Sequence, residues 1–500
     1  MTLMSDTQAV MGAFAGYLLL MLAIGGWAYY RTYNFNDYIL GGRRLGPWPT
    51  ALSAGASDMS GWLLLGLPGY AYLAGLEALW LVLGLLLGTW LNWHLMAQRL
   101  RRYSERAEDA LTIPAFLEAR FQERTRLLRL VSALFILTFF LFYTSSGLVA
   151  GARLFETVFG LPYLWALLAG TGAIILYTFL GGFLAVAWTD LVQGLLMAAA
   201  LLIVPLYAFA AMGGVGDGLL RVQQINPQLL NALTNSAGEP LGWLAIVSLL
   251  GWGLGYFGQP HILARFKAIR HHRELGQARR IAVGWSALTL LGATLVGLAA
   301  IGYLPEPLAG KDSERAFMLL AGTLFNPLVA GVLLAAVLAA IMSTADSQLL
   351  VSSSALAEDF YKALLRREAS PRELILVGRV AVVLVALIAF ALALQPDRKV
   401  LDLVAYAWAG FGAAFGPTLL LALYWQRMNR WGALAGIVTG GLTVVVWKPL
   451  QGGLFDLYEL VPAFAASLLA IGVVSLFTSP PPPQVVARHQ VLAEEELGDE

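Results

Sequence analysis

The chain has 500 residues, of which 59% are hydrophobic and 13% are charged, and its mean hydropathy is +0.71. That composition excludes an ordinary soluble globular protein and favours a chain that lies in a lipid bilayer. The absence of cysteine excludes disulfides and cysteine chemistry, and a net charge of +1 argues against a nucleic-acid partner.

Thirteen apolar stretches follow one another along the chain. Stretches of about 18 or more apolar residues are typical of transmembrane helices, so the sequence predicts an all-α integral membrane protein with about 13 transmembrane helices. The first span is expected to be retained, because the residues before it lack the Lys or Arg that opens a signal peptide. The predicted spans are 8–29, 48–73, 75–97, 127–155, 161–180, 187–211, 239–258, 281–303, 327–356, 374–394, 401–424, 431–448 and 459–477.

The basic residues predict the orientation of these spans. Lys and Arg are frequent in the loops 98–126, 261–280 and 361–373 and in two shorter connections, whereas the loop 212–238 contains only Arg221. With thirteen spans, all the basic connections fall on one side, which the positive-inside rule makes cytoplasmic. We therefore expect a bacterial-type inner-membrane protein with its N-terminus outside and its C-terminus in the cytoplasm.

The C-terminal end has the composition of a solvated tail. The run SPPPP at 479–483 cannot continue a helix, and EEELGDE at 494–500 is strongly acidic. Residues 479–500 are expected to form a disordered cytoplasmic tail. His271 and His272 lie in a basic loop, where adjacent histidines favour an exposed surface over a metal site.

Span two contains SAGASDMSG at 53–61, with a carboxylate, Asp58, at membrane depth. A charged residue within a span indicates a functional site. Glycine and serine weaken a helix, and unwound backbone is tolerated there only where it lines a cavity or is buried in protein. The stretch therefore predicts a broken helix whose carbonyl and hydroxyl oxygens suit a hard cation such as sodium.

Span seven contains a second weak stretch, LLGWGLGYFGQP at 249–260. Trp252, Tyr256 and Pro260 recur at a spacing of four and are expected to share one helix face. They predict an aromatic pocket for a small zwitterion, and the alternative is helix packing through small residues. A second break in the corresponding place favours the pocket and predicts two five-helix inverted repeats, spans two to six and seven to eleven.

Span nine adds a group of hydroxyls in AAIMSTADSQLLVSSS at 339–354. Ser343, Thr344 and Ser347 lie within one turn of each other, together with Asp346. Hydroxyls in membrane helices usually bond to their own preceding carbonyls, but this density exceeds that need. We expect an oxygen cluster that faces the break at Asp58.

Five stretches together resemble the sodium:solute symporter family over all thirteen spans. The resemblance implies a ten-helix core of two inverted five-helix repeats at 48–424, after a helix and loop at 1–47 and before two helices at 425–478. It also implies alternating access, and the third stretch favours the proline carriers of the family. The stretches are FNDYILGGRRLGP at 35–47, ALSAGASDMSGWLLLGLPG at 51–69, GWGLGYFGQPHILARF at 251–266, LVSSSALAEDFYK at 350–362 and FGAAFGPTLLLALYW at 411–425.

The resemblance also implies roles for individual residues. One Na+, the coupling ion, would be held by the carbonyls of Ala56, Met59 and Ala340 and the hydroxyls of Ser343 and Thr344. Asp58 would act in sodium coupling, and Arg43 in cytoplasmic gating. The residues that would line the substrate site are Ser60, Gly61, Trp62, Tyr143, Trp252, Tyr256 and Pro260.

A second sodium site stays open. Some members of the family place a second ion between an aspartate of span six and hydroxyls of span nine, here Asp190 with Ser343 and Ser347. Asp190 is equally well explained as a capping carboxylate at a helix start. Asp346 stands where proline carriers have a small neutral residue, so it would add a ligand, create a proton-sensitive site or pair with a cation. We expect one sodium.

Together with these observations, the resemblance implies sodium-coupled import of L-proline, with proline, sodium and the bilayer as partners and no obligate protein partner. The alternative is a symporter for another small amino acid or organic acid. The stretches 53–61 and 249–260 contain no arginine for the substrate carboxylate, so half-helix amides are expected to bind it. An intramembrane enzyme is not expected, because the sequence lacks HExxH and any histidine in a polar cluster, and a sensor would need a separate signalling partner.

Overall fold

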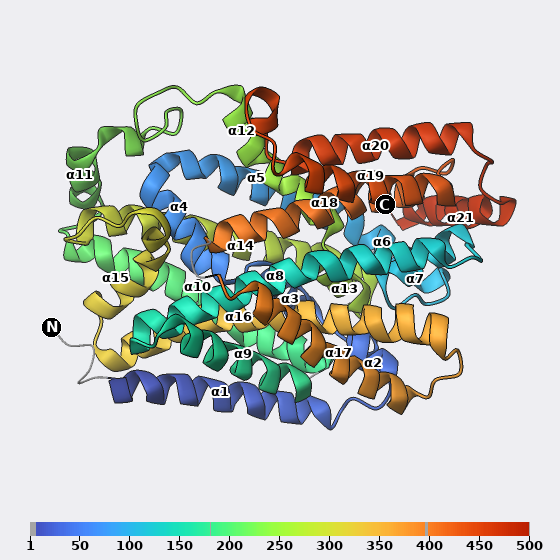
Figure 1. Cartoon of the computed structure of the whole chain (residues 1–500), viewed down its shortest axis with the longest axis horizontal. Coiled ribbons are helices and arrows are strands. Elements are labelled where there is room, and N and C mark those ends of the chain that lie inside the picture. Colours follow the sequence, from blue (N-terminus) through green and yellow to red (C-terminus); the bar gives the residue numbers. More distant parts are fainter. Residues whose placement is uncertain (1–6, 181, 396–398, 500) are drawn as a thin grey trace.

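The computed structural model describes residues 7–180, 182–395 and 399–499. In this part of the chain the regular structure is helical, and β-pairing is limited to isolated bridges such as Leu45–Ile269. Figure 1 shows the long helices α1, α8, α16 and α20 running roughly along the longest axis of the molecule. The predicted all-α class is therefore confirmed.

All thirteen predicted apolar stretches are helical over most of their described length. The helices of these stretches are α1 (Thr7–Tyr29), α3 (Pro47–Asp58), α4 (Leu67–Ala74), α5 (Ala78–Leu91), α8 (Leu127–Phe159), α9 (Tyr163–Leu180), α10 (Phe183–Ala211), α12 (Trp243–Gly251), α14 (Leu275–Tyr303), α16 (Pro327–Ser354), α17 (Pro371–Leu392), α18 (Val400–Tyr424), α19 (Arg430–Trp447) and α20 (Leu460–Phe477). The connecting helices are α2 (Phe35–Leu40), α6 (Ala97–Arg106), α7 (Ile113–Phe121), α11 (Val215–Ile225), α13 (Pro260–Ala268), α15 (Ala316–Leu324) and α21 (Pro483–Asp499).

Ten helical runs among the described residues are long and apolar enough to cross a membrane. Trp62–Arg106 is one such run and joins parts of two predicted spans. Two shorter apolar helical segments, Tyr163–Ile175 and Trp243–Gly258, coincide with further predicted spans. The multi-pass architecture is thus clear, and the count of thirteen crossings stays a prediction.

Local sequence explains where several of these helices begin. Asn326, Ser370 and Asn429 each accept a hydrogen bond from a backbone N–H in the first turn of the helix that follows. Proline occupies the first position of α16 and of α17, where its missing N–H costs nothing. Such caps end the loops sharply and fix where each helix enters the bundle.

The contacts between helices repeat between the two halves of the core. In the first half, α3 to α10, the broken helix α3 packs against the last helix, α10. In the second half, α12 to α18, the 3₁₀ segment η6 (Trp252–Gly258) of the broken helix packs against the last helix, α18. Each broken helix also packs against the second helix of the other half, as α3 does on α14 and η6 does on α5. Likewise α10 contacts α16, and α18 contacts α8. Five crossings in the first half make the second half start from the opposite side of the membrane, so two equivalent halves are inverted relative to each other. The repeated contacts therefore agree with the expected five-plus-five inverted repeat.

The C-terminal tail differs from the expectation of disorder. Residues Pro483–Asp499 form α21, because the last proline of the SPPPP run takes the first helical position. Val485 and His489, one turn apart, are buried, and the His489 ring lies 3.4 Å from the Arg120 guanidinium. Burial, with Arg120 and Arg99 nearby, lowers the pKa of His489 to about 4. The helix therefore packs through a neutral imidazole at physiological pH.

Candidate functional site

The first predicted break lies at the end of α3. Met59 leaves the helix with φ −85° and ψ 79°, and the amide of Ser60 bonds the carbonyl of Asp58 at 3.0 Å. The chain then resumes as a π-helical turn, η2 (Trp62–Gly66), followed by α4. Every residue from Pro49 to Trp62 is buried. Small residues thus allow an interruption inside the protein, where its polar backbone is shielded from lipid.

The second break follows η6, at Gln259, whose φ of −81° and ψ of 106° are extended. A Cβ at Gly255 would lie 1.9 Å from Trp408 Nε1, and one at Gly258 would lie 2.1 Å from the Phe411 carbonyl oxygen. These glycines therefore let the broken helix press against α18. The break and the close packing through small residues are both present, and the aromatic pocket stays a prediction.

The expected sodium ligands gather beside the first break. Ser343 Oγ lies 2.8 Å from the carbonyl oxygen of Ala56 and 3.1 Å from that of Ala340, and Thr344 Oγ1 lies 3.3 Å from the Ala56 carbonyl. All of these residues are buried, as is Met59. Hydroxyl oxygens carry lone pairs as well as a proton, so this donor set of neutral oxygens fits a hard monovalent cation. Among the described residues, no group of three His, Cys, Asp or Glu could hold a metal ion.

Asp58 joins the two breaks. Tyr256, on η6, donates a hydrogen bond from its hydroxyl to Asp58 Oδ2 at 2.7 Å. Tyr143 of α8 donates to the Asp58 carbonyl oxygen at 3.2 Å, and Trp62 Nε1 donates to the same oxygen at 3.4 Å. Asp58 Oδ1 is buried without a hydrogen-bond partner in the described structure. A buried carboxylate oxygen of this kind favours a nearby cation.

The expected substrate residues divide into two groups. Ser60 and Gly61 lie in the first break, and the aromatic side chains of Trp62, Tyr143 and Tyr256 converge there on Asp58. The ring of Trp252 instead stacks on Tyr458 with centroids 5.2 Å apart.

Pro260 begins α13 and lines a separate cavity. The single face expected for Trp252, Tyr256 and Pro260 is therefore wrong. The 3₁₀ geometry of η6 has three residues per turn, so a spacing of four does not keep side chains on one face.

The possible second sodium site contains Arg265, which the span prediction assigns to the connection 261–280. Arg265 is fully buried on α13, and its guanidinium lies 3.2 Å from Asp190 Oδ2, 2.6 Å from Ser347 Oγ and 3.0 Å from Ser53 Oγ. Asp190 lies inside α10, so it is not a helix cap. The signal was available, because Arg265 follows the helix-starting Pro260 within the apolar stretch PHILARF.

Two carboxylates surround this single buried guanidinium. Asp346 is buried beside Ser347, and Asp346 Oδ2 and Asp190 Oδ1 both lack a hydrogen-bond partner in the described structure. The ion pair of Arg265 is formed with Asp190. The cluster therefore holds more acceptor oxygens than Arg265 satisfies.

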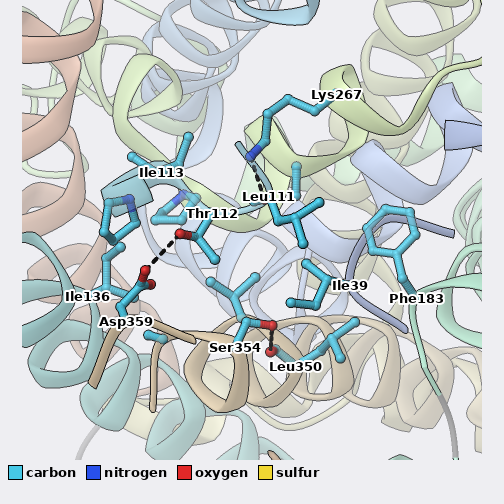
Figure 2. Close-up of a pocket in the computed structure, with 15 residues that line it drawn as sticks. Ile39, Leu111, Thr112, Ile113, Ile136, Phe183, Lys267, Leu350, Ser354 and Asp359 are labelled. Atoms are coloured by element: carbon cyan, nitrogen blue, oxygen red, sulfur yellow. Dashed lines mark hydrogen bonds between the residues drawn. The ribbon is translucent and has the colours of Figure 1, made fainter. Parts of the chain in front are cut away.

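A second group of cations connects α13 to the loop between α6 and α7. Arg43 donates to Asp109 Oδ1 at 2.6 Å and to the Lys267 carbonyl oxygen at 2.7 Å. The buried ammonium of Lys267 donates to the Leu111 carbonyl oxygen at 2.6 Å (Figure 2). The span prediction assigns Lys267 to the same connection, 261–280. These bonds tie the half-helix α13 to the region that the positive-inside rule makes cytoplasmic.

A cavity of about 30 Å³ borders this connection, and Lys267 and Leu111 contribute to its lining. Figure 2 shows Lys267 on one side of it and the hydrogen-bonded pair Thr112–Asp359 on another, with mainly apolar side chains between them. Arg129 pairs with Asp359 at 2.7 Å, and Pro260 also lines the cavity. The cavity thus adjoins the second break and lies on its expected cytoplasmic side.

Known proteins resemble this chain in sequence and in fold. The chain is 52% identical over 483 residues to a protein of Escherichia coli K12 named "Sodium/proline symporter", with 96% of this chain and 95% of the relative covered. It is 51% identical over 463 residues to "High-affinity proline transporter PutP" of Bacillus subtilis 168, with 92% and 96% covered. The fold resembles a solved Na+-coupled sialic acid symporter, with a TM-score of 0.78, 20% identity, and 95% and 99% covered. Since the model of the sodium:solute symporter family also matches residues 38–440, this chain belongs to the sodium:solute symporter family.

Proposed function

We propose that this protein imports L-proline together with sodium, by alternating access through a core at 48–424. The observation that carries the proposal is the oxygen cluster of Ala56, Ser343 and Thr344 beside the broken helix at Asp58. The names of the E. coli and B. subtilis relatives, each about half identical over most of its length, support proline as the substrate.

The sodium site links the two repeats. The carbonyls of Ala56 and Met59 belong to the broken first helix, whereas Ala340, Ser343 and Thr344 belong to α16 of the second repeat. A bound sodium draws these oxygens together, and so holds the first repeat against the second. Neutral ligands release sodium readily, and an inside-negative potential favours its entry by about 2.3 kcal/mol per charge per 100 mV.

Proline is proposed to bind on the side of Asp58 that faces Tyr143 and Tyr256. Its secondary ammonium is a cation that suits both a free carboxylate oxygen and an aromatic face within about 6 Å. Its carboxylate suits the positive end of the helix that begins after the first break. Asp58 would then lie between sodium and the substrate ammonium, and so couple the two.

One sodium per transport cycle is proposed. The Arg265 guanidinium already supplies a positive charge between Asp190 and Ser347, where a second sodium was considered. The remaining oxygens of Asp190 and Asp346 suit a proton or a weak ion. Uptake should therefore depend on sodium without cooperativity.

The proposal predicts uptake by this chain alone. In proteoliposomes that contain only the purified protein, labelled proline should accumulate under an inward sodium gradient and not under an equal potassium gradient. The initial rate should depend on the sodium concentration with a Hill coefficient near one, and excess unlabelled amino acids and carboxylates test the substrate.

Sealed vesicles with folded protein and no proline accumulation would refute proline as the substrate. Accumulation that needs a second protein would refute the absence of an obligate partner. A Hill coefficient near two would restore the second sodium site.

Replacing one proposed ligand should weaken sodium binding selectively. In Ser343→Ala one of five oxygens is lost, and a hydrogen bond to a charged group is worth about 1.5–3 kcal/mol. The sodium concentration for half-maximal uptake should therefore rise about tenfold or more. Thr294→Ala removes another buried hydroxyl, which bonds only the Leu290 carbonyl oxygen, and should leave the sodium dependence unchanged. Equal effects in both variants would argue against the site.

Arg43 is proposed to hold the cytoplasmic gate closed through Asp109 and the Lys267 carbonyl. Because the chain has no cysteine, a single Ser354→Cys change reports access to the cavity behind that gate. When Arg43→Gln is added to the Ser354→Cys variant, a small maleimide should label the introduced thiol several-fold faster in inside-out vesicles. The control is Arg44→Gln, since Arg44 is half exposed and its partners in the described part of the chain are the Asp37 carboxylate and the Gly41 carbonyl. Unchanged labelling would remove Arg43 from the gate.

The orientation is proposed to be N-terminus outside and C-terminus in the cytoplasm of a bacterial inner membrane. In Figure 1, α11 and α15 lie at one end of the molecule, and α2, α7 and α21 at the other. A membrane-impermeant maleimide should label Ser236→Cys, in the loop after α11, on intact spheroplasts. It should label Glu368→Cys, before α17, only after the membrane is opened. The reverse pattern would invert the topology.

A further inference from the structure

A cavity of about 420 Å³ lies apart from the transport site, near the end of α1. It is formed where α1 ends, where α2 passes, and where α10 and α17 begin. The positive-inside rule places all of these ends on the cytoplasmic side. The lining residues are Tyr29, Tyr30, Thr32, Tyr38, Gly182, Arg372, Ile375, Leu376 and Arg379.

Among the described residues, the lining carries two guanidiniums and no carboxylate. Arg372 and Arg379 are seven residues apart on α17 and so lie on the same helix face. The nearest carboxylate along α17, Glu373, pairs with Arg366 at 2.9 Å and accepts a hydrogen bond from Tyr361. On α2, Asp37 pairs with Arg44. The described residues that line the cavity therefore bring two positive charges and no negative charge.

Two further features add to this charge. The cavity lies at the beginning of α17, a helix of 22 residues whose N-terminal dipole attracts anions. Tyrosine hydroxyls and the Thr32 hydroxyl supply neutral hydrogen-bonding groups, and the Arg379 guanidinium lies 5.7 Å from the centre of the Tyr29 ring. This combination of guanidinium, helix terminus and hydroxyl groups suits a phosphate.

The cavity also borders the apolar outer surface of the protein. Leu376 is 62% exposed and Val380, one turn further, is 60% exposed, so α17 presents these side chains outward. Tyr30 is 80% exposed, as expected for an aromatic residue in the interfacial belt. A ligand that fills the cavity therefore meets cations at one end and an apolar helix face at the other.

We propose that this cavity binds the headgroup of an anionic phospholipid. The phosphate pairs with Arg372 and Arg379, and the acyl chains lie along Leu376 and Val380. The lipid would join the end of α1 to the beginning of α17. The cytoplasmic leaflet supplies such lipids, and basic clefts between helices on that side are a recurring place for them. The apolar border distinguishes a lipid from free phosphate.

Native mass spectrometry of the purified full chain tests this proposal without measuring transport. With equal phosphatidylglycerol and phosphatidylcholine added in detergent, the protein should retain phosphatidylglycerol preferentially. Arg372→Gln with Arg379→Gln should reduce this retention at least tenfold. Arg430→Gln is the matched control, because Arg430 is also exposed at the start of a spanning helix, over the Trp431 ring. It should retain the lipid as the unchanged protein does.

Further arms separate the alternatives. Arg372→Lys with Arg379→Lys keeps the charge and should restore part of the retention, whereas loss through misfolding would appear as a lowered melting temperature in both double variants. Excess inorganic phosphate should not displace the lipid, and displacement would assign the cavity to free phosphate. Equal retention of both lipids, or no effect of the Gln variants, would overturn the proposal.

Discussion

The structure depends on one constraint, which is that backbone polar groups at membrane depth need partners inside the protein. The chain breaks a helix at Met59 and at Gln259, in positions where an unsatisfied carbonyl costs several kcal/mol in hydrocarbon. Both breaks are buried, and each is covered by helices of both repeats. The carbonyl oxygen of Ala56 faces the hydroxyls of Ser343 and Thr344 on α16. Uncharged oxygens are thereby brought together in one place.

The two breaks are joined to each other. The Tyr256 hydroxyl from the second break bonds the Asp58 carboxylate in the first, and Tyr143 of α8 bonds the Asp58 carbonyl. A movement of either repeat must therefore change the surroundings of Asp58. This is the geometry that coupling requires, since one ion and one substrate bias the same two-state arrangement only when both contact elements that move relative to each other.

The buried charges show how tightly the surroundings of α13 are specified. Arg265 connects α13 to Asp190 on α10, to Ser347 on α16 and to Ser53 on α3. Removing one member of such a cluster leaves a charge in a low dielectric, at a typical cost of about 3–5 kcal/mol. The network thus fixes the position of the half-helix α13, whose far end carries Lys267 and contacts Arg43.

The sequence by itself determined the features that depend on local composition. Apolar length determined the helices, and the small residues around Asp58 and Gly255 determined the breaks, because helix stability is set by neighbouring residues. The oxygen cluster at Ser343 and the family were also recognisable from the sequence. Only the tertiary structure decided that Arg265 is buried, that Trp252 stacks on Tyr458 and that residues 483–499 form a helix in which Val485 and His489 are buried. Each of these depends on contacts between segments far apart in the chain, and neither periodicity nor composition encodes which surfaces will meet.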